Sequence, residues 1–197
     1  DALELVGNKA AARGAAAAAG VPVLPATDRP ASVADVENFF RARGGPIMIK
    51  ALAGGGGRGM RPGRDADQIG DAYRQCAAEA QLGFGDPALF AEVLLEDARH
   101  IEVQVVAAPA EHQTRALALG DRDCSIQRRR QKIVEVAPAQ GLSGEVRRDL
   151  HQAAARLCAR VGLHGLATVE FLVAGGEFVF LEVTPRIQVE HTVTEET

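Results

Sequence analysis

Two alternating runs of apolar and polar residues, joined at Gly175 and Gly176, constrain the fold more than any other stretch. The run from Ala167 to Val183 predicts a β-hairpin, because every second residue of a strand faces the same side. A second alternating run, Arg99 to Val105, predicts a half-buried strand with one polar face. Antiparallel strands are therefore expected to form the framework of the chain.

The other periodic segments predict helices and further strands in a mixed order. Helices are expected at Lys9–Ala19, Ser32–Gly44, Asp65–Leu82 and Ser143–Val161. Strands are expected at Pro46–Leu52, Phe90–Leu95, Gln113–Leu119, Gln131–Val136 and Gln188–Thr194. Because hairpins interrupt the order of strands and helices, the sequence predicts an α+β fold with largely antiparallel sheets.

Composition excludes several classes of protein. The 197 residues are 47% hydrophobic, enough for a buried core, and the net charge of -4 does not favour nucleic acid. No apolar run approaches the roughly 20 residues that cross a bilayer. Cys76, Cys124 and Cys158 lack metal-ligand spacing and fit a reducing compartment, so we expect a cytoplasmic location. The abrupt ends lead us to expect a piece of a longer protein.

Four consecutive glycines, Gly54 to Gly57, follow Lys50 and precede Arg58. Glycines let backbone N–H groups approach an anion closely, and the two cations would add positive charge. The order differs from a P-loop, in which the lysine follows the glycines. The stretch is interpreted either as a mobile phosphate-binding loop or as a flexible turn between two strands.

The predicted hairpin carries two glutamates, Glu170 and Glu182. If its apolar residues form one core face, both carboxylates share the opposite face and suit Mg²⁺. The predicted core-facing residues are Val169, Phe171, Val173, Val179, Leu181 and Val183. A two-residue turn would break this register, so we expect a loop of odd length. The alternative is a solvated face with two unrelated glutamates.

Arg186, Gln188 and Glu190 alternate along a segment that we expect to be extended. On one side of a strand they would offer a guanidinium fork, an amide and a carboxylate to a small planar anion. The alternative is an exposed edge strand. Nearby, the basic cluster from Gln127 to Lys132 is interpreted as a solvated loop, and Cys124 as a small packing residue.

Taken together, the motifs resemble the ATP-grasp domain of biotin carboxylase, the ATP-dependent part of acyl-CoA and pyruvate carboxylases. The blocks run in the family's order across nearly the whole chain. They are GNK (Gly7–Lys9), KALAGGGGRGMR (Lys50–Arg61), RHIEVQV (Arg99–Val105), RDCSIQRRRQK (Arg122–Lys132) with AP (Ala137–Pro138), TVEF (Thr168–Phe171) and LEVTPRIQVEHTVTE (Leu181–Glu195). The resemblance implies an ATP-grasp fold, with a lid at about residues 22–91 and a central sheet formed by 92–197 with 1–21.

The resemblance also implies roles for individual residues. ATP would contact Lys9, Lys50, Gly55, Gly56, Gly57, Glu92, Leu95, His100, Gln127 and Arg130. The metal would be held by Glu170, Glu182 and Thr184. Bicarbonate would be bound by Lys132, Arg186, Gln188 and Val189, with Glu190 as general base and Lys132 and Arg186 as further catalytic residues.

The implied reaction is carboxylation of biotin by bicarbonate and ATP through carboxyphosphate. It implies Mg²⁺ or Mn²⁺, biotin on a carrier domain, a carboxyltransferase domain or subunit, and an oligomeric parent protein. Thr184 stands where the family usually has asparagine, and Arg130 where it usually has histidine. Val93 and Ala167 also depart from the usual residues, and flanking domains of the family are absent, so this piece is expected to bind ATP better than it turns it over.

Two other functions remain open at this point. The first is another ATP-grasp ligase, such as half of a carbamoyl-phosphate synthetase, which also activates bicarbonate. The second is a noncatalytic nucleotide-binding domain that has lost turnover through Thr184 and Arg130. Biotin dependence separates the first from a carboxylase, and bicarbonate-stimulated hydrolysis excludes the second.

Overall fold

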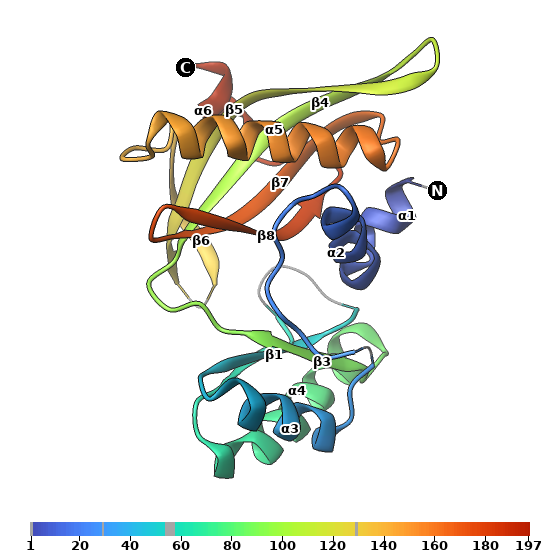
Figure 1. Cartoon of the computed structure of the whole chain (residues 1–197), viewed down its shortest axis with the longest axis vertical. Helices are drawn as coiled ribbons and strands as arrows, with labels where there is room; N and C mark the ends of the chain where they lie inside the picture. Colours follow the sequence, from blue (N-terminus) through green and yellow to red (C-terminus); the bar gives the residue numbers. More distant parts are fainter. Residues whose placement is uncertain (1, 29, 54–57, 129) are drawn as a thin grey trace. The chain divides into compact units, whose positions relative to one another are not determined.

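A computed structural model of the chain describes residues 2–28, 30–53, 58–128 and 130–197, which form two compact units (Figure 1). The larger unit contains the N-terminal stretch up to Val23, together with Asp97–Arg128 and Lys132–Thr197. The smaller unit contains Leu24–Glu96 with Arg130 and Gln131. Both units combine a sheet with helices, and β1–β2, β1–β3, β4–β5, β4–β7 and β7–β8 pair antiparallel, which confirms the α+β class.

A five-stranded sheet forms the framework of the larger unit. Its strands lie in the order β6 (Gln131–Val136), β5 (Gln113–Arg128), β4 (Arg99–Ala110), β7 (Gly165–Ala174) and β8 (Glu177–Thr184). The predicted hairpin is therefore confirmed as β7 and β8. The predicted strand at Gln113 is confirmed but extends to Arg128, so the acidic and basic residues that follow Leu119 lie largely in a strand.

Three helices cover the apolar face of this sheet: α1 (Ala2–Gly7), α2 (Lys9–Ala18) and α5 (Gly144–Arg160). The side chain of Asn8 caps α2, and that of Ser143 caps α5, as the sequence predicted. In Figure 1, α5 runs across the sheet over β4, β5 and β7. The core includes Ile101, Val103, Val105, Leu150, Leu157, Val169 and Phe171.

The β7–β8 hairpin pairs Glu170 with Glu182 as predicted, but the turn and the register that produce this pairing differ from the prediction. Its turn holds two residues, Gly175 and Gly176, both with positive φ, so the expected odd-length loop is wrong. A β-bulge restores the register, since Phe171 pairs with Phe180 and Glu170 with Glu182. Because of this bulge, Phe180 and not Val179 or Leu181 joins the core, which corrects the predicted core face of β8.

Two further expectations about strands are wrong. Strand β4 is not half-buried at its centre, because Glu102 and Gln104 on its polar face are buried as well. The expected strand at Gln188–Thr194 is instead a turn that leads into the short helix α6 (His191–Glu195). Both differences arise from polar contacts on the second face of the sheet, described below.

The smaller unit holds a three-stranded sheet in the order β2 (Met60–Gly63), β1 (Ile47–Ala51) and β3 (Leu89–Val93). Helices α3 (Val33–Arg43) and α4 (Ala66–Phe84) pack on it around a separate core. Ser32 and Asp35 form a capping box at the start of α3, and Gly44 ends that helix in the left-handed conformation. Across the described residues of both units, every helix is too short or too polar to cross a membrane.

Candidate active site

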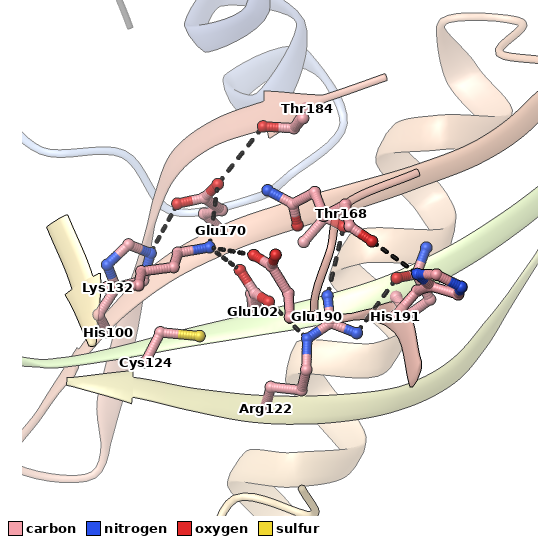
Figure 2. A network of polar contacts seen from close by, with 12 residues as sticks. His100, Glu102, Arg122, Cys124, Lys132, Thr168, Glu170, Thr184, Glu190 and His191 are labelled. Carbon is pink, nitrogen blue, oxygen red and sulfur yellow. Dashed lines mark hydrogen bonds and ion pairs between the residues drawn. The ribbon is translucent and has the colours of Figure 1, made fainter. Parts of the chain in front are cut away.

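A connected network of charged and hydrogen-bonding side chains covers the polar face of the five-stranded sheet (Figure 2). Its members come from β4 to β8 and from the segment around the start of α6. Those labelled in Figure 2 are His100, Glu102, Arg122, Cys124, Lys132, Thr168, Glu170, Thr184, Glu190 and His191. Several are fully buried, which strengthens the electrostatic interactions among them.

Lys132 lies at the centre of the network, where its ammonium group faces three carboxylates. Its Nζ contacts the Glu102 carboxylate and lies 3.1 Å from Glu190 Oε1 and 3.8 Å from Glu170 Oε1. Burial alone lowers the pKa of a lysine, but the charges of Glu170 and Glu102 outweigh it and raise the pKa of Lys132. Lys132 therefore stays protonated and presents a fixed positive charge.

Arg122 on β5 is completely buried, with 0% of its surface exposed. Its Nε donates to Glu102 Oε1 at 2.5 Å, so Glu102 accepts from both Arg122 and Lys132. The guanidinium also donates to Gln104 Oε1 at 3.2 Å. Glu102 is thus a buried carboxylate between two cations, an arrangement that offsets the cost of burying its charge.

Glu170 is a buried carboxylate with partners on two strands. Its Oε2 accepts a hydrogen bond from His100 Nε2 at 2.6 Å, and Thr184 Oγ1 donates to its Oε1 at 3.4 Å. Burial raises the pKa of this carboxyl, but the His100 hydrogen bond and the Lys132 charge lower it below the ordinary value. Glu170 is therefore ionised at neutral pH and available to a cation.

Oxygen-bearing side chains gather around Glu170. Glu182 lies opposite it in the β7–β8 register, and Glu182 Oε2 is 3.5 Å from Lys9 Nζ. On the other side, ligand atoms of His100, Glu102 and Glu170 all lie within 4.8 Å of one another. Either group of carboxylates offers the hard oxygen ligands that divalent cations such as Mg²⁺ prefer.

His100 connects the carboxylates to a residue predicted near the nucleotide. Gln127 Nε2 donates to His100 Nδ1 at 2.8 Å, which leaves the ring proton on Nε2, where it is directed at Glu170. His100 and Gln127, both predicted to contact ATP, are therefore in direct contact with each other. Their contact orients the imidazole toward Glu170.

The segment between β8 and α6 does not place its predicted residues on one side. Arg186 is exposed and donates to the carbonyl oxygen of Ile187, whereas Gln188 is buried and Val189 is 90% exposed. The expected alternation of Arg186, Gln188 and Glu190 along a strand is therefore wrong. The side-chain oxygen of Gln188 is buried without a hydrogen-bond partner among the described residues, whereas Glu190 reaches Lys132.

The remaining predicted nucleotide residues belong to the smaller unit. Lys50 on β1 and Glu92 on β3 are both buried and form an ion pair with each other. Leu95 follows β3, and Arg130 donates to the Met60 carbonyl oxygen at 2.8 Å. Gly55, Gly56 and Gly57, like Arg129 in the basic cluster, lie outside the described residues.

Residues of the polar face that were not singled out as functional from the sequence include Glu102, Arg122 and Glu135. Glu102 shares the alternating polar face of β4 with His100 and Gln104. The alternation predicts that Glu102 lies on this face, but it does not predict which residues Glu102 contacts. Arg122 and Glu135 come from β5 and β6, and only the strand order brings them to this face.

Glu135 has an unusual environment. Ligand atoms of Glu102, Cys124 and Glu135 lie within 4.8 Å of one another, and Glu135 Oε2 is buried without a hydrogen-bond partner in the described part of the chain. Burial and the charges of Glu190 and Glu102 raise the pKa of Glu135 to about 7. This carboxyl therefore changes its protonation state near neutral pH.

Comparison with known proteins gives consistent matches over nearly the whole chain. A family model described as "Carbamoyl-phosphate synthase L chain, ATP binding domain" matches residues 8–197. Pyruvate carboxylase of Bacillus subtilis is 47% identical over 98% of this chain, which spans 17% of that relative's length.

Two solved structures match as well. A biotin carboxylase from Campylobacter jejuni, in complex with β-γ-ATP, has a TM-score of 0.94 and 38% identity over 99% of this chain and 44% of its own. A single-chain, multi-domain long-chain acyl-CoA carboxylase has 62% identity and a TM-score of 0.77 over all of this chain and 16% of its own. These likenesses confirm the predicted ATP-grasp fold and the resemblance to biotin carboxylase.

Proposed function

Since the chain belongs to the family of the carbamoyl-phosphate synthase L chain ATP-binding domain, we propose that its parent protein carboxylates biotin with bicarbonate and ATP. The chain spans less than half the length of the relatives reported above, so the activity is proposed for the whole protein. Within that protein this segment would form carboxyphosphate, and the acyl-CoA or pyruvate acceptor would be chosen elsewhere.

One observation carries this proposal: Lys132 lies between the proposed base Glu190 and the proposed metal ligand Glu170. A cation at that position can bind an anion that reacts beside a metal-bound phosphate. Gln188 lies two residues before Glu190, and its buried side-chain oxygen, which has no hydrogen-bond partner among the described residues, can accept a hydrogen bond from the O–H group of bicarbonate. Such preorganised charge is the main source of rate enhancement in phosphoryl transfer.

In the proposed reaction, Lys132 holds bicarbonate and a Glu190 carboxylate oxygen takes its O–H proton. The bicarbonate oxygen then forms a bond to the γ-phosphorus of ATP while the bond to the ADP oxygen breaks. Carboxyphosphate splits into CO₂ and phosphate, the released phosphate takes the proton of the biotin ureido N–H, and that nitrogen then bonds to the carbon of CO₂. Arg186 is exposed at the same segment and is proposed to contact the anion together with Val189.

Glu170, Glu182 and Thr184 fit the chemistry of a Mg²⁺ or Mn²⁺ site, because they bring oxygen ligands from paired strands to one face. The ion, when bound, would neutralise charge on the ATP phosphates. In the same proposal the residues that contact ATP are Lys9, Lys50, Gly55, Gly56, Gly57, Glu92, Leu95, His100, Gln127 and Arg130. Residues of about 22–91 would act as a lid that moves during the cycle.

Biotin on a carrier domain and a carboxyltransferase domain or subunit are the proposed partners, in an oligomeric parent protein. The names of the relatives, carboxylases in each case, support this assignment. The proposed location is the cytoplasm, where the three free cysteines would stay reduced.

The test is ADP release by the longest natural chain containing this segment, with MgATP and bicarbonate, in the presence and absence of free biotin. We expect release that requires bicarbonate and increases with biotin. Bicarbonate-dependent release indifferent to biotin would instead indicate a ligase of the carbamoyl-phosphate synthase type. Tight ATP binding without release would indicate a noncatalytic domain.

A further inference from the structure

A closed ring of polar contacts holds the segment from Glu190 to Thr194 against the sheet. At one end, Glu190 Oε1 lies 3.1 Å from Lys132 Nζ. At the other end, Thr194 Oγ1 accepts a hydrogen bond from Arg122 NH1 at 2.6 Å. Glu102 closes the ring because it contacts both Lys132 and Arg122, as Figure 2 shows for the labelled members.

Arg122 is a rigid anchor for this segment. Its planar guanidinium also donates to Gln104 Oε1 at 3.2 Å and lies 3.5 Å from Thr168 Oγ1. These partners come from β4 and β7, and Arg122 is completely buried. A guanidinium held from several directions cannot turn, so the sheet fixes the position of its bond to Thr194.

A glycine on β5, Gly120, allows Thr194 to lie close to the strand. Gly120 pairs with Gln104 and so belongs to the polar face. A Cβ added at Gly120 would lie 3.2 Å from Thr194 Cγ2, tighter than ordinary van der Waals contact. The absence of a side chain at Gly120 is a second feature, independent of the hydrogen bond, that seats Thr194 on the strand.

We propose that Arg122 and Thr194 are positioning residues that fix α6 on the sheet and thereby hold Glu190 against Lys132. Helix α6 has only five residues, and isolated helices of this length are not stable in water. Its position therefore depends on tertiary contacts such as the one at Thr194. The inference rests on the proposed function, in which Glu190 is the base for bicarbonate.

The first test compares Thr194→Val, which removes the hydroxyl at nearly constant volume, with Thr194→Ser, which keeps it. Thr192→Val is the matched control, because Thr192 lies on the same helix and its side chain is exposed. In the full-length parent protein, we expect Thr194→Val to lower kcat/KM for bicarbonate about tenfold, the effect of one charged hydrogen bond. The KM for MgATP should stay unchanged, and Thr194→Ser should recover most activity.

A second measurement tests the anchor without using activity. Hydrogen exchange of the Val193 and Glu196 amides, which bond to the Glu190 and Thr192 carbonyl oxygens, reports opening of this segment. Exchange should be about tenfold faster in Thr194→Val than in Thr192→Val. Gly120→Ala should accelerate exchange as well, and the double variant should show less than the product of the two effects, since both act on one contact.

The outcomes separate the two proposals. Unchanged exchange in Thr194→Val overturns the anchor, whether or not the protein is active. Faster exchange with unchanged bicarbonate kinetics overturns its positioning role and leaves the proposed function intact. A parent protein without bicarbonate-dependent ADP release contradicts the proposed function, and with it any role of the anchor in that reaction.

Discussion

The two faces of the five-stranded sheet are built by opposite means. One face packs Val103, Val169 and Phe171 beneath α1, α2 and α5, and its contacts are almost entirely apolar. The other buries Glu102, Arg122 and Glu170 in a network that includes Lys132. Apolar burial stabilises without regard to exact geometry, whereas buried charges are tolerated only when each is paired. The apolar face therefore supplies nonspecific stabilisation, whereas the polar face holds charged groups in fixed positions.

The largest expected effect is on the apolar face. Leu150→Ala on α5 removes a completely buried side chain and should lower the free energy of unfolding by roughly 3–5 kcal/mol. Leu117→Ala, at a position on β5 that is 63% exposed, is the matched control and should change it by less than about 0.5 kcal/mol. Urea unfolding of both variants measures the difference, and equal losses would contradict the assignment of the core.

The next largest loss of stability is expected when the ion pairs on the polar face are broken. Glu102→Gln leaves Arg122 and Lys132 without their shared carboxylate, so we expect a loss of about 3 kcal/mol in the free energy of unfolding. Glu111→Gln makes the same chemical change at an exposed turn and serves as control. If both variants unfold at the same urea concentration, the buried network does not need Glu102.

Asp121 is an exception to the contrast between the two faces. It is a buried carboxylate on the helix-covered side of β5, where the other contacts are almost entirely apolar. Asp121 accepts from His151 Nε2 at 2.7 Å, Ala139 N at 2.8 Å and Arg147 NH1 at 2.9 Å. Burial raises the Asp121 pKa, but the hydrogen bonds from His151 and Ala139 and the Arg147 charge lower it overall.

Because the folded pKa of Asp121 is depressed, its stabilisation is present above the unfolded pKa of about 4 and is lost as pH falls through the folded value. Asp121→Asn should therefore be about 2 kcal/mol less stable than wild type at pH 7. The difference should shrink below pH 4 in acid unfolding curves. A gap that stays constant to pH 2 would contradict this origin.

The smallest effect concerns Glu135 on the polar face. Its pKa is raised to about 7, so its contribution to stability is fully present below the unfolded pKa of about 4.5 and is lost as pH rises through 7. Glu135→Gln does not ionise and should gain about 1 kcal/mol relative to wild type between pH 4.5 and 8, since partial exposure screens the interaction. Unfolding free energies that stay parallel over this range would argue against the raised pKa.

Sequence patterns predicted much of the fold because apolar periodicity determines which side of an element is buried. The strands at Arg99 and Gln131, the helix capped by Ser143 and the facing of Glu170 with Glu182 all follow from it. The β-bulge that produces this pairing could not be predicted. It falls at Leu181, and an apolar residue at that position is equally compatible with a regular strand.

The segment around α6 shows why part of the candidate site escaped prediction. Val189, Thr192, Val193 and Thr194 are β-branched residues that favour strands, yet the segment turns and becomes helical. The hydrogen bond from Arg122 to Thr194 spans 72 residues of sequence. No local pattern reveals such a contact, and the same holds for the pairing of Arg122 with Glu102.

The most direct test of the account is Glu190→Gln in the full-length parent protein, with ATP binding and bicarbonate-dependent ADP release measured together. Loss of the general base should reduce ADP release by at least about 100-fold while the Kd for MgATP stays unchanged. Glu195→Gln, on the exposed side of α6, should behave as wild type. ADP release that persists at the wild-type rate in Glu190→Gln would contradict the claim that the polar face activates bicarbonate through Glu190.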